Sequence, residues 1–187
     1  MADTVRIQTE DFDLTQELGN LRAGNRAVGA VCAFVGTVRE WQNPTDANQP
    51  QAADKAVQGM TLEHYPGMTE RAIQNMIVEA HQRFDFMNAL VIHRIGELAT
   101  CDQIVLVAVT SAHRGESFKA CEFLMDYLKT QAPFWKKEAT AAGATWVDAR
   151  ESDDLALHKW GIASQNRSRV DALKLLASSP TEEQFIR

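Results

Sequence analysis

Several features that define whole classes of protein are missing from this sequence. It contains no run of 18 apolar residues, so a membrane-spanning helix is not expected. Its first residues, Met1-Ala2-Asp3-Thr4, lack the charged and apolar regions of a secretory signal peptide. The close Cys and His spacings that hold zinc, such as CxxC and HExxH, are also missing. We therefore expect neither a metal nor another cofactor, and no contact with a membrane.

Cysteine is scarce. The 187 residues include three, Cys32, Cys101 and Cys121, an odd number at wide spacing. This argues against a disulfide framework and for reduced thiols in the cytoplasm. Cys32 and Cys121 lie in apolar segments and are predicted to be small core residues. Cys101 is predicted to lie in a turn, where the neighbouring Asp102 disfavours the thiolate. No cysteine is therefore expected to carry sulfur chemistry.

An excess of positive charge is missing too. Nineteen Lys and Arg residues against 25 Asp and Glu residues give a formal net charge of −6. Nucleic acid is therefore not an expected partner, because phosphate binding needs a clustered positive excess. The hydrophobic and charged fractions, 45% and 24%, are ordinary for a globular domain. Any anion site must be a local basic pocket on an acidic body.

The spacing of apolar residues predicts strands and helices in irregular alternation. Strands are expected at 5–9, 28–38, 59–65, 89–95, 104–110 and 145–149, with 89–95 alternating as in a half-buried strand. Helices are expected after an N-cap at Asp13, at 68–84, 114–129 and 135–142, and near 169–176. Segment 40–58 is predicted to be a mobile loop. This order predicts an α+β sheet with helices on one face.

Two candidate anion sites lie where predicted strands end. Segment 111–117 joins a buried strand to a helix, and a helix N-terminus presents unpaired N–H groups and a partial positive charge to an anion. His113 and Arg114 add side-chain donors there. The alternative is a plain capping turn with a surface arginine. Arg39 ends the strand 28–38 and is suited to bind phosphate, although an exposed arginine without a ligand explains it as well.

Two lysine-containing segments form a second set of candidates. On a helical wheel, Lys129 lies at the edge of the apolar stripe of the helix 114–129. A lysine held against apolar surface loses hydration and can become a base or nucleophile. Alternatively its stem lies along the surface while its amine pairs with Asp126. Segment 133–138 places two aromatic residues beside two lysines, which suits a flat anionic ring or, alternatively, an aromatic anchor with solvated charges.

Several of these segments together resemble one family, the catalytic (large) subunit of molybdopterin synthase. The segments that carry the resemblance occur in this order: Phe34–Arg39, Leu62–Met68, His93–Gly96, Ser111–Arg114, Pro133–Glu138, Trp146–Val147 and Ala149–Arg150. No single segment is specific, but several at compatible spacing are. The resemblance implies an α/β hammerhead-type fold, mainly an antiparallel sheet with helices packed on it. It covers a catalytic domain at 1–150 and leaves a partly helical C-terminal extension at 151–187.

The same resemblance implies an activity in molybdenum cofactor biosynthesis. The implied enzyme is a sulfurtransferase that converts cyclic pyranopterin monophosphate to molybdopterin. The two sulfurs come from the C-terminal Gly-Gly thiocarboxylate of a small ubiquitin-like sulfur-carrier subunit. The implied assembly is a homodimer within a heterotetramer. The implied catalytic residues are Lys129 and Lys136, and the implied substrate-binding residues are Thr37, Val38, Arg39, His113, Arg114, Lys137, Glu138 and, toward a neighbouring subunit's site, Arg150.

Other functions remain open at the level of the sequence. One alternative is a non-catalytic module that binds a ubiquitin-like tail, although it would not need both lysines and the anion-binding cluster. Another is a phosphate-ester hydrolase that uses His113, for which no metal set or second base is evident. The residues also leave open which lysine moves a proton and which stabilises charge. The loop 40–58 and the tail after Arg150 are longer than the family pattern predicts.

Overall fold

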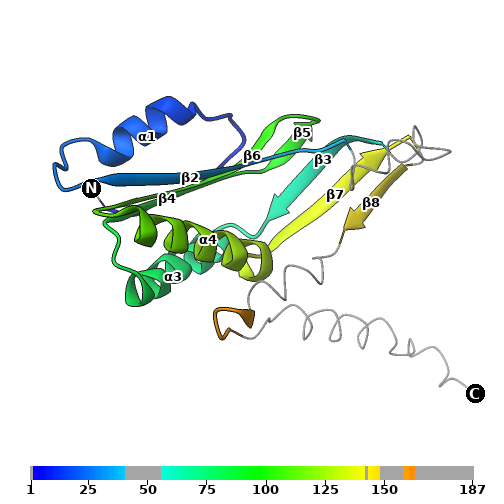
Figure 1. The fold of residues 1–187 in the computed structure, drawn as a ribbon. Helices are drawn as coiled ribbons and strands as arrows, with labels where there is room; N and C mark the ends of the chain where they lie inside the picture. Colours follow the sequence, from blue (N-terminus) through cyan, green and yellow to red (C-terminus); the bar gives the residue numbers. More distant parts are fainter. Residues whose placement is uncertain (1, 41–55, 142, 148–157, 163–187) are drawn as a thin grey trace, which may run out of the picture.

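Two four-stranded sheets and three helices form the described part of the protein, residues 2–40, 56–141, 143–147 and 158–162 of a computed structural model (Figure 1). The first sheet has the strand order β1 (Thr4–Gln8), β4 (Asn88–Arg94), β6 (Gln103–Ser111), β2 (Ala30–Thr37). The second has the order β5 (Gly96–Ala99), β3 (Val57–His64), β7 (Phe134–Thr140), β8 (Gly143–Val147). The helices are α1 (Leu14–Arg22), α3 (Met68–Arg83) and α4 (Arg114–Gln131). All pairings are antiparallel except β1 with β4, which confirms the predicted α+β class.

Helices cover both faces of the first sheet, not one as predicted. Helix α1 lies on one face, while α3 and α4 lie on the other (Figure 1). Leu90 and Ile92 of β4 pack with α1, whereas Ala89 and Val91 pack with α3 and α4. Strand β4 is therefore buried on both faces, and its predicted half-burial is wrong. The predicted alternation placed Ala89, Val91 and His93 on one buried face, but α1 covers the opposite face with Leu90 and Ile92 as well.

The observed positions of the three helices agree with those predicted from local sequence signals. The Asp13 side chain accepts the Gln16 N–H at 2.9 Å, which is the predicted N-cap of α1. The apolar spacings that predicted helices at 68–84 and 114–129 correspond to α3 and α4. Among the described residues, no helix is long and apolar enough to cross a membrane.

The prediction of a helix at 135–142 is wrong, because this segment forms β7 instead. Strand β7 pairs with β3 on one side and with β8 on the other, so its backbone groups are bonded from both edges. The Lys, Glu and Ala residues of this segment favour helix, but pairing with two strands overrides that local preference. The predicted loop at 40–58 also ends early, since Val57 is buried and begins β3. Residues 41–55 of that loop lie outside the described residues.

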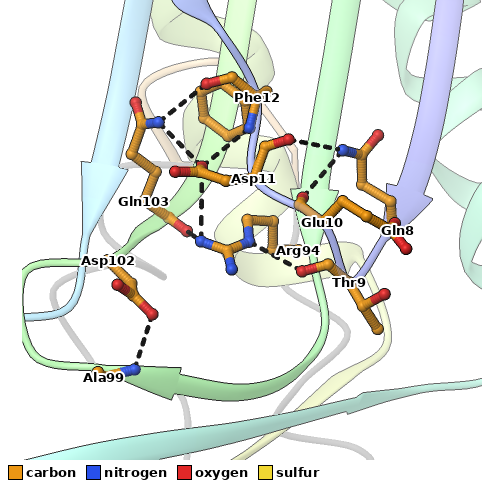
Figure 2. A network of polar contacts seen from close by, with 9 residues as sticks. All are labelled: Gln8, Thr9, Glu10, Asp11, Phe12, Arg94, Ala99, Asp102 and Gln103. Carbon is orange, nitrogen blue, oxygen red and sulfur yellow. Dashed lines mark hydrogen bonds and ion pairs between the residues drawn. The ribbon is translucent and has the colours of Figure 1, made fainter.

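Polar contacts fix the end of the first sheet that leads toward Arg39. Figure 2 shows Arg94 at their centre, where its guanidinium donates to the carbonyl oxygens of Thr9 at 3.2 Å and Gln103 at 3.0 Å and pairs with the Asp11 carboxylate at 3.5 Å. The Gln103 amide also donates to Asp11, at 2.9 Å. These contacts tie the chain after β1 to β4 and β6. Thr37 pairs with Gln103 in the sheet, so the network supports the end of β2.

Of the predicted C-terminal extension, the structure describes residues 158–162. Their aromatic and aliphatic side chains, Trp160 and Ile162, pack against the main core between the sheet, α3 and α4. Arg150 and the helix predicted near 169–176 lie outside the described residues, so their predictions stay untested.

Candidate active site

The backbone before Arg39 is held from both sides. The Val38 N–H donates to the Asp102 carbonyl at 2.9 Å, and the Cys101 N–H donates to the Val38 carbonyl at 2.9 Å. The Val38 side chain is buried, and the sheet register shifts just before Thr37. A buried anchor between two exposed residues presents the side chains of Thr37 and Arg39 on the surface. The three residues predicted to bind substrate here therefore lie on a fixed backbone.

The N-terminus of α4 is built by a close backbone approach. The Gly29 N–H donates to the Ser111 carbonyl at 3.0 Å, and a Cβ on Gly29 would lie only 2.3 Å from the Ala112 carbonyl oxygen. The Ser111 hydroxyl donates to the His113 carbonyl at 2.7 Å, which fixes the residue before the helix. His113 is the N-cap and makes no capping bond with its side chain, and both His113 and Arg114 are exposed. Two basic side chains thus stand at the positive end of the helix dipole, as predicted.

A hollow of about 350 Å³ lies between β2 and α4, and it is called the α4–β2 hollow below. The side chains that line it are Cys32, Ala33, Phe34, Phe118, Cys121, Met125, Glu122, Asp126 and Lys129. Its walls are mainly apolar, with Phe34 and Phe118 both substantially exposed. Of the predicted catalytic residues, Lys129 lines it. Glu122 and Asp126 place two carboxylates on the same wall, a feature that the sequence analysis did not single out.

The two lysines of β7 point to opposite faces of the second sheet. Lys136 pairs with Leu62 and Glu138 with Met60 across β3, so both face the small core around those residues. The Lys136 ammonium lies 2.5 Å from the Glu138 carboxylate. Glu138 is only 7% exposed, and a buried carboxylate needs such a partner. Lys137 faces the other way, with its ammonium 5.6 Å from the Trp146 ring centroid.

The start of β7 is attached to the first sheet by an aromatic stack. The rings of Phe134 and His93 lie 3.8 Å apart with an angle of 16° between them. Burial, with a smaller contribution from the nearby His64, lowers the pKa of His93 to about 4. The hydrogen bond between its Nδ1 and the Arg94 carbonyl, at 2.8 Å, acts in the opposite direction without reversing the shift. His93 is therefore neutral at pH 7 and packs as an aromatic residue.

The three cysteines have the surroundings that the sequence predicts. Cys121 is buried and donates to the Val107 carbonyl at 3.7 Å, Cys32 is half-buried, and Cys101 is exposed in a turn. Burial raises the pKa of the Cys121 thiol, and contact with Cys32 raises it further. Neither effect favours a reactive thiolate. Within the described ranges, no group of three His, Cys, Asp or Glu side chains is arranged to hold a metal ion.

Within a single chain, several of the predicted site residues lie far apart. Arg114 and Lys129 are 15 residues apart in α4, which corresponds to about 22 Å at 1.5 Å per residue. Ser111, next to the start of α4, pairs with Ala30, whereas Arg39 follows Thr37 at the far end of β2, about 24 Å away at 3.4 Å per residue. His113 and Arg114 thus stand apart from Arg39 and from Lys129. Arg150 lies outside the described residues.

Comparison with known proteins identifies the family. The family model described as MoaE protein matches residues 7–131. This chain belongs to the MoaE family. The match runs from the end of β1 to the end of α4, and therefore includes both Arg39 and the His113–Arg114 pair of this MoaE chain.

Relatives agree with this MoaE chain over most of its length. A protein of Ralstonia nicotianae named molybdopterin synthase catalytic subunit is 52% identical over 180 residues, which is 96% of this chain and 97% of that protein. A solved MoaE protein of Burkholderia ambifaria is 50% identical, with a TM-score of 0.70, over 87% of this chain and 99% of its own. A molybdopterin synthase structure from Staphylococcus aureus is 29% identical, with a TM-score of 0.65, over 76% and 95%. The predicted family and fold class are confirmed, while the roles of individual residues stay predictions.

Proposed function

We propose that this chain is the catalytic subunit of a molybdopterin synthase. In that role it converts cyclic pyranopterin monophosphate to molybdopterin by inserting two sulfurs. The observation that carries the proposal is the agreement, along nearly the whole chain, with relatives of that name. The site geometry supports it, because exposed basic groups on fixed backbone suit a phosphate and exposed aromatic rings suit a pterin.

The sulfur comes from a partner in this proposal, a small ubiquitin-like subunit with a C-terminal Gly-Gly thiocarboxylate. The name catalytic subunit itself describes one part of an assembly. The surroundings of the cysteines also support an external donor, since Cys121 and Cys32 are placed as packing residues. Reduced thiols are consistent with the cytoplasm, which we propose as the location.

We further propose that a second copy of the chain completes the site. The separation of about 22 Å between Arg114 and Lys129 is too large for one small phosphorylated ring to contact both. Strand β2 is an edge strand of the first sheet and exposes Val31 and Phe34, and Phe34 lines the hollow together with Phe118 of α4. A homodimer across such a surface brings His113 and Arg114 of one copy toward Lys129 and Arg39 of the other. Arg150 keeps its predicted role of reaching a neighbouring subunit's site.

The two lysines differ in how they are held, which suggests a division of roles. Lys136 is oriented by its ion pair with Glu138, and a fixed ammonium is suited to stabilise negative charge that develops during sulfur attack. Lys129 stands on the wall of the α4–β2 hollow beside Phe34, whose exposed ring is suited to stack on the pterin. We assign proton transfer to Lys129. Thr37, Arg39 and Lys137 are assigned to direct contact with the substrate, whereas Val38 and Glu138, which are buried, hold Arg39 and Lys136 in position.

A reconstituted reaction tests this proposal. The purified chain, the thiocarboxylated partner and cyclic pyranopterin monophosphate should yield a dithiolene-bearing product. Lys129→Ala should lower the rate by about 10²–10⁴-fold, the usual contribution of a general acid or base, with unchanged folding. Lys119→Ala is the matched control, because Lys119 lies on the same helix and pairs only with the nearby Glu116 among the contacts described, at 3.0 Å.

Three outcomes would contradict the proposal. Full turnover by Lys129→Ala would remove the assigned role of that lysine. A tight complex with the partner but no turnover by the unmodified chain would favour a binding module. Phosphate release without any sulfur donor would favour a hydrolase.

A further inference from the structure

A short segment from the C-terminal part of the chain, residues 158–162, is fixed against α3 and α4. The Trp160 ring meets the rings of Phe84 and Phe123 edge to face, with centroids 5.6 and 5.4 Å away. The Trp160 carbonyl accepts a hydrogen bond from the Arg83 guanidinium at 2.7 Å. The segment is therefore held by packing and by a charge-assisted hydrogen bond, 30 residues or so beyond the end of α4.

This segment delivers a positive charge to the acidic wall of the α4–β2 hollow. The Lys159 ammonium lies 2.7 Å from the Glu122 carboxylate and 2.7 Å from the Asp126 carboxylate. The Trp160 indole N–H donates to the same Asp126 oxygen at 2.9 Å. Partial burial lowers the pKa of Lys159, but its bonds to Asp126 and Glu122 outweigh that effect, so the pKa is raised and the amine stays charged.

The charge matters because Glu122 and Asp126 line the hollow together with Lys129. Without Lys159, the wall carries two carboxylates and one ammonium, a combination that repels an anion. With Lys159 bound to both carboxylates, the charges balance. Interactions between unit charges several ångströms apart at a partly solvated surface are large enough to change the affinity for an anion severalfold.

We propose that Lys159 and Trp160 are positioning residues, which hold Asp126 and offset the acidic wall so that an anionic substrate is accepted beside Lys129. The inference rests on the proposed function in one respect, namely that the substrate carries a phosphate. Lys159 supplies the compensating charge, whereas Trp160 supplies the packing and the hydrogen bond that orient Asp126. Neither residue touches the reacting atoms in this proposal.

The first experiment measures the electrostatic potential at Lys129 without using the reaction. The full chain is acetylated with a neutral N-hydroxysuccinimide ester and, separately, with its negatively charged sulfonated form, and the rate at Lys129 is followed by mass spectrometry. The sulfonated-to-neutral rate ratio should fall by about two- to sixfold in Lys159→Met, and further in Lys159→Glu. Lys159→Arg should restore it, and 0.5 M salt should reduce the difference. Lys119→Met, the same charge change on an ion pair with Glu116, should leave it unchanged.

The second experiment measures turnover by the assembled enzyme. Lys159→Met should raise KM for the phosphorylated substrate by about three- to tenfold at low salt and leave kcat nearly unchanged. Trp160→Phe keeps an aromatic ring and the Lys159 charge and removes only the N–H that donates to Asp126, so it should raise KM less than Lys159→Met does. A purely structural role predicts instead a loss that follows thermal stability and does not depend on salt.

The outcomes separate this inference from the proposed function. Equal labelling ratios in the wild type, Lys159→Met and Lys159→Glu would overturn the inference, even if the wild type turns over normally. If the wild type makes no product but the ratios change as expected, the proposed function fails and the electrostatic role of Lys159 stands.

Discussion

Gly29 is the position at which a single methyl group should disturb both stability and the turn that carries His113. A Cβ at this residue would lie 2.3 Å from the Ala112 carbonyl oxygen, well inside the 3.0 Å that such contacts keep. The obstacle is backbone, and it is fixed on either side by the Gly29–Ser111 and Ser111–His113 hydrogen bonds. Gly29→Ala must therefore push β2 and the start of α4 apart by several tenths of an ångström or more.

Overpacking of this kind usually costs about 1–3 kcal/mol. Urea denaturation measures this loss of free energy directly. For a chain of this size it corresponds to a fall in Tm of about 2–12 °C, measured by thermal denaturation. The carbonyl that must move belongs to the residue before His113, so kcat/KM should fall as well. Displacement of a binding group by about 1 Å can lower the rate up to about 10²-fold.

Gly19→Ala is the matched control for Gly29→Ala. Gly19 lies within α1, and a Cβ there would meet no atom within 4 Å. The same methyl should therefore stabilise the protein by about 0.5–1 kcal/mol, because alanine favours helix over glycine. If Gly29→Ala unfolds at the wild-type urea concentration, the close approach of β2 to α4 described here is incorrect.

Two further predictions concern His93 and Cys101. The pKa of His93 is about 4 in the folded chain and 6.5 in the unfolded chain, so between these values only the unfolded state takes up the proton. The free energy of unfolding, measured by urea titration, should thus fall by up to about 3 kcal/mol as pH drops from 6.5 to 4. His93→Phe removes the titrating group but keeps a ring against Phe134, so its free energy of unfolding should fall less over the same pH range. Cys101 has a φ of 75°, a backbone conformation that favours glycine. Cys101→Gly should therefore raise the free energy of unfolding by about 0.5–1 kcal/mol, and with it the urea midpoint. An unchanged or lower midpoint would argue against strain at this residue.

The parts of the fold that depend on neighbouring residues were predictable from the sequence. Asp13 caps α1 through a residue three positions away, and the apolar stripe of α3 repeats within a few turns. Segment 134–140 was not predictable in this way, because its strand conformation depends on pairing with β3, 70 or more residues earlier in the chain. The double burial of β4 likewise depends on α1, which covers the face of Leu90 and Ile92 that the prediction of half-burial left exposed.

The candidate site divides along the same line. Arg39 and His113 were predicted as site residues from their positions at strand and helix ends, and Lys129 from its place beside an apolar stripe, and their roles stay predictions. Glu122 and Asp126, which form the acidic wall, are four residues apart in the sequence and therefore lie one helical turn apart on α4. Its compensation by Lys159 could not be predicted, because that contact spans 33 or more residues and follows no periodicity. Local sequence patterns likewise do not predict which side chains of two copies of the chain come into contact.

The length of α4 also limits how the protein can change over time. A residue added to this helix or removed from it would shift Lys129 by 1.5 Å along the axis and turn it by about 100° relative to Arg114. An indel of seven residues would nearly restore the direction but displace the lysine by about 10 Å. Because the proposed function uses both residues, insertions and deletions between them should be rejected by selection, while substitutions on the solvent side of the helix should be tolerated.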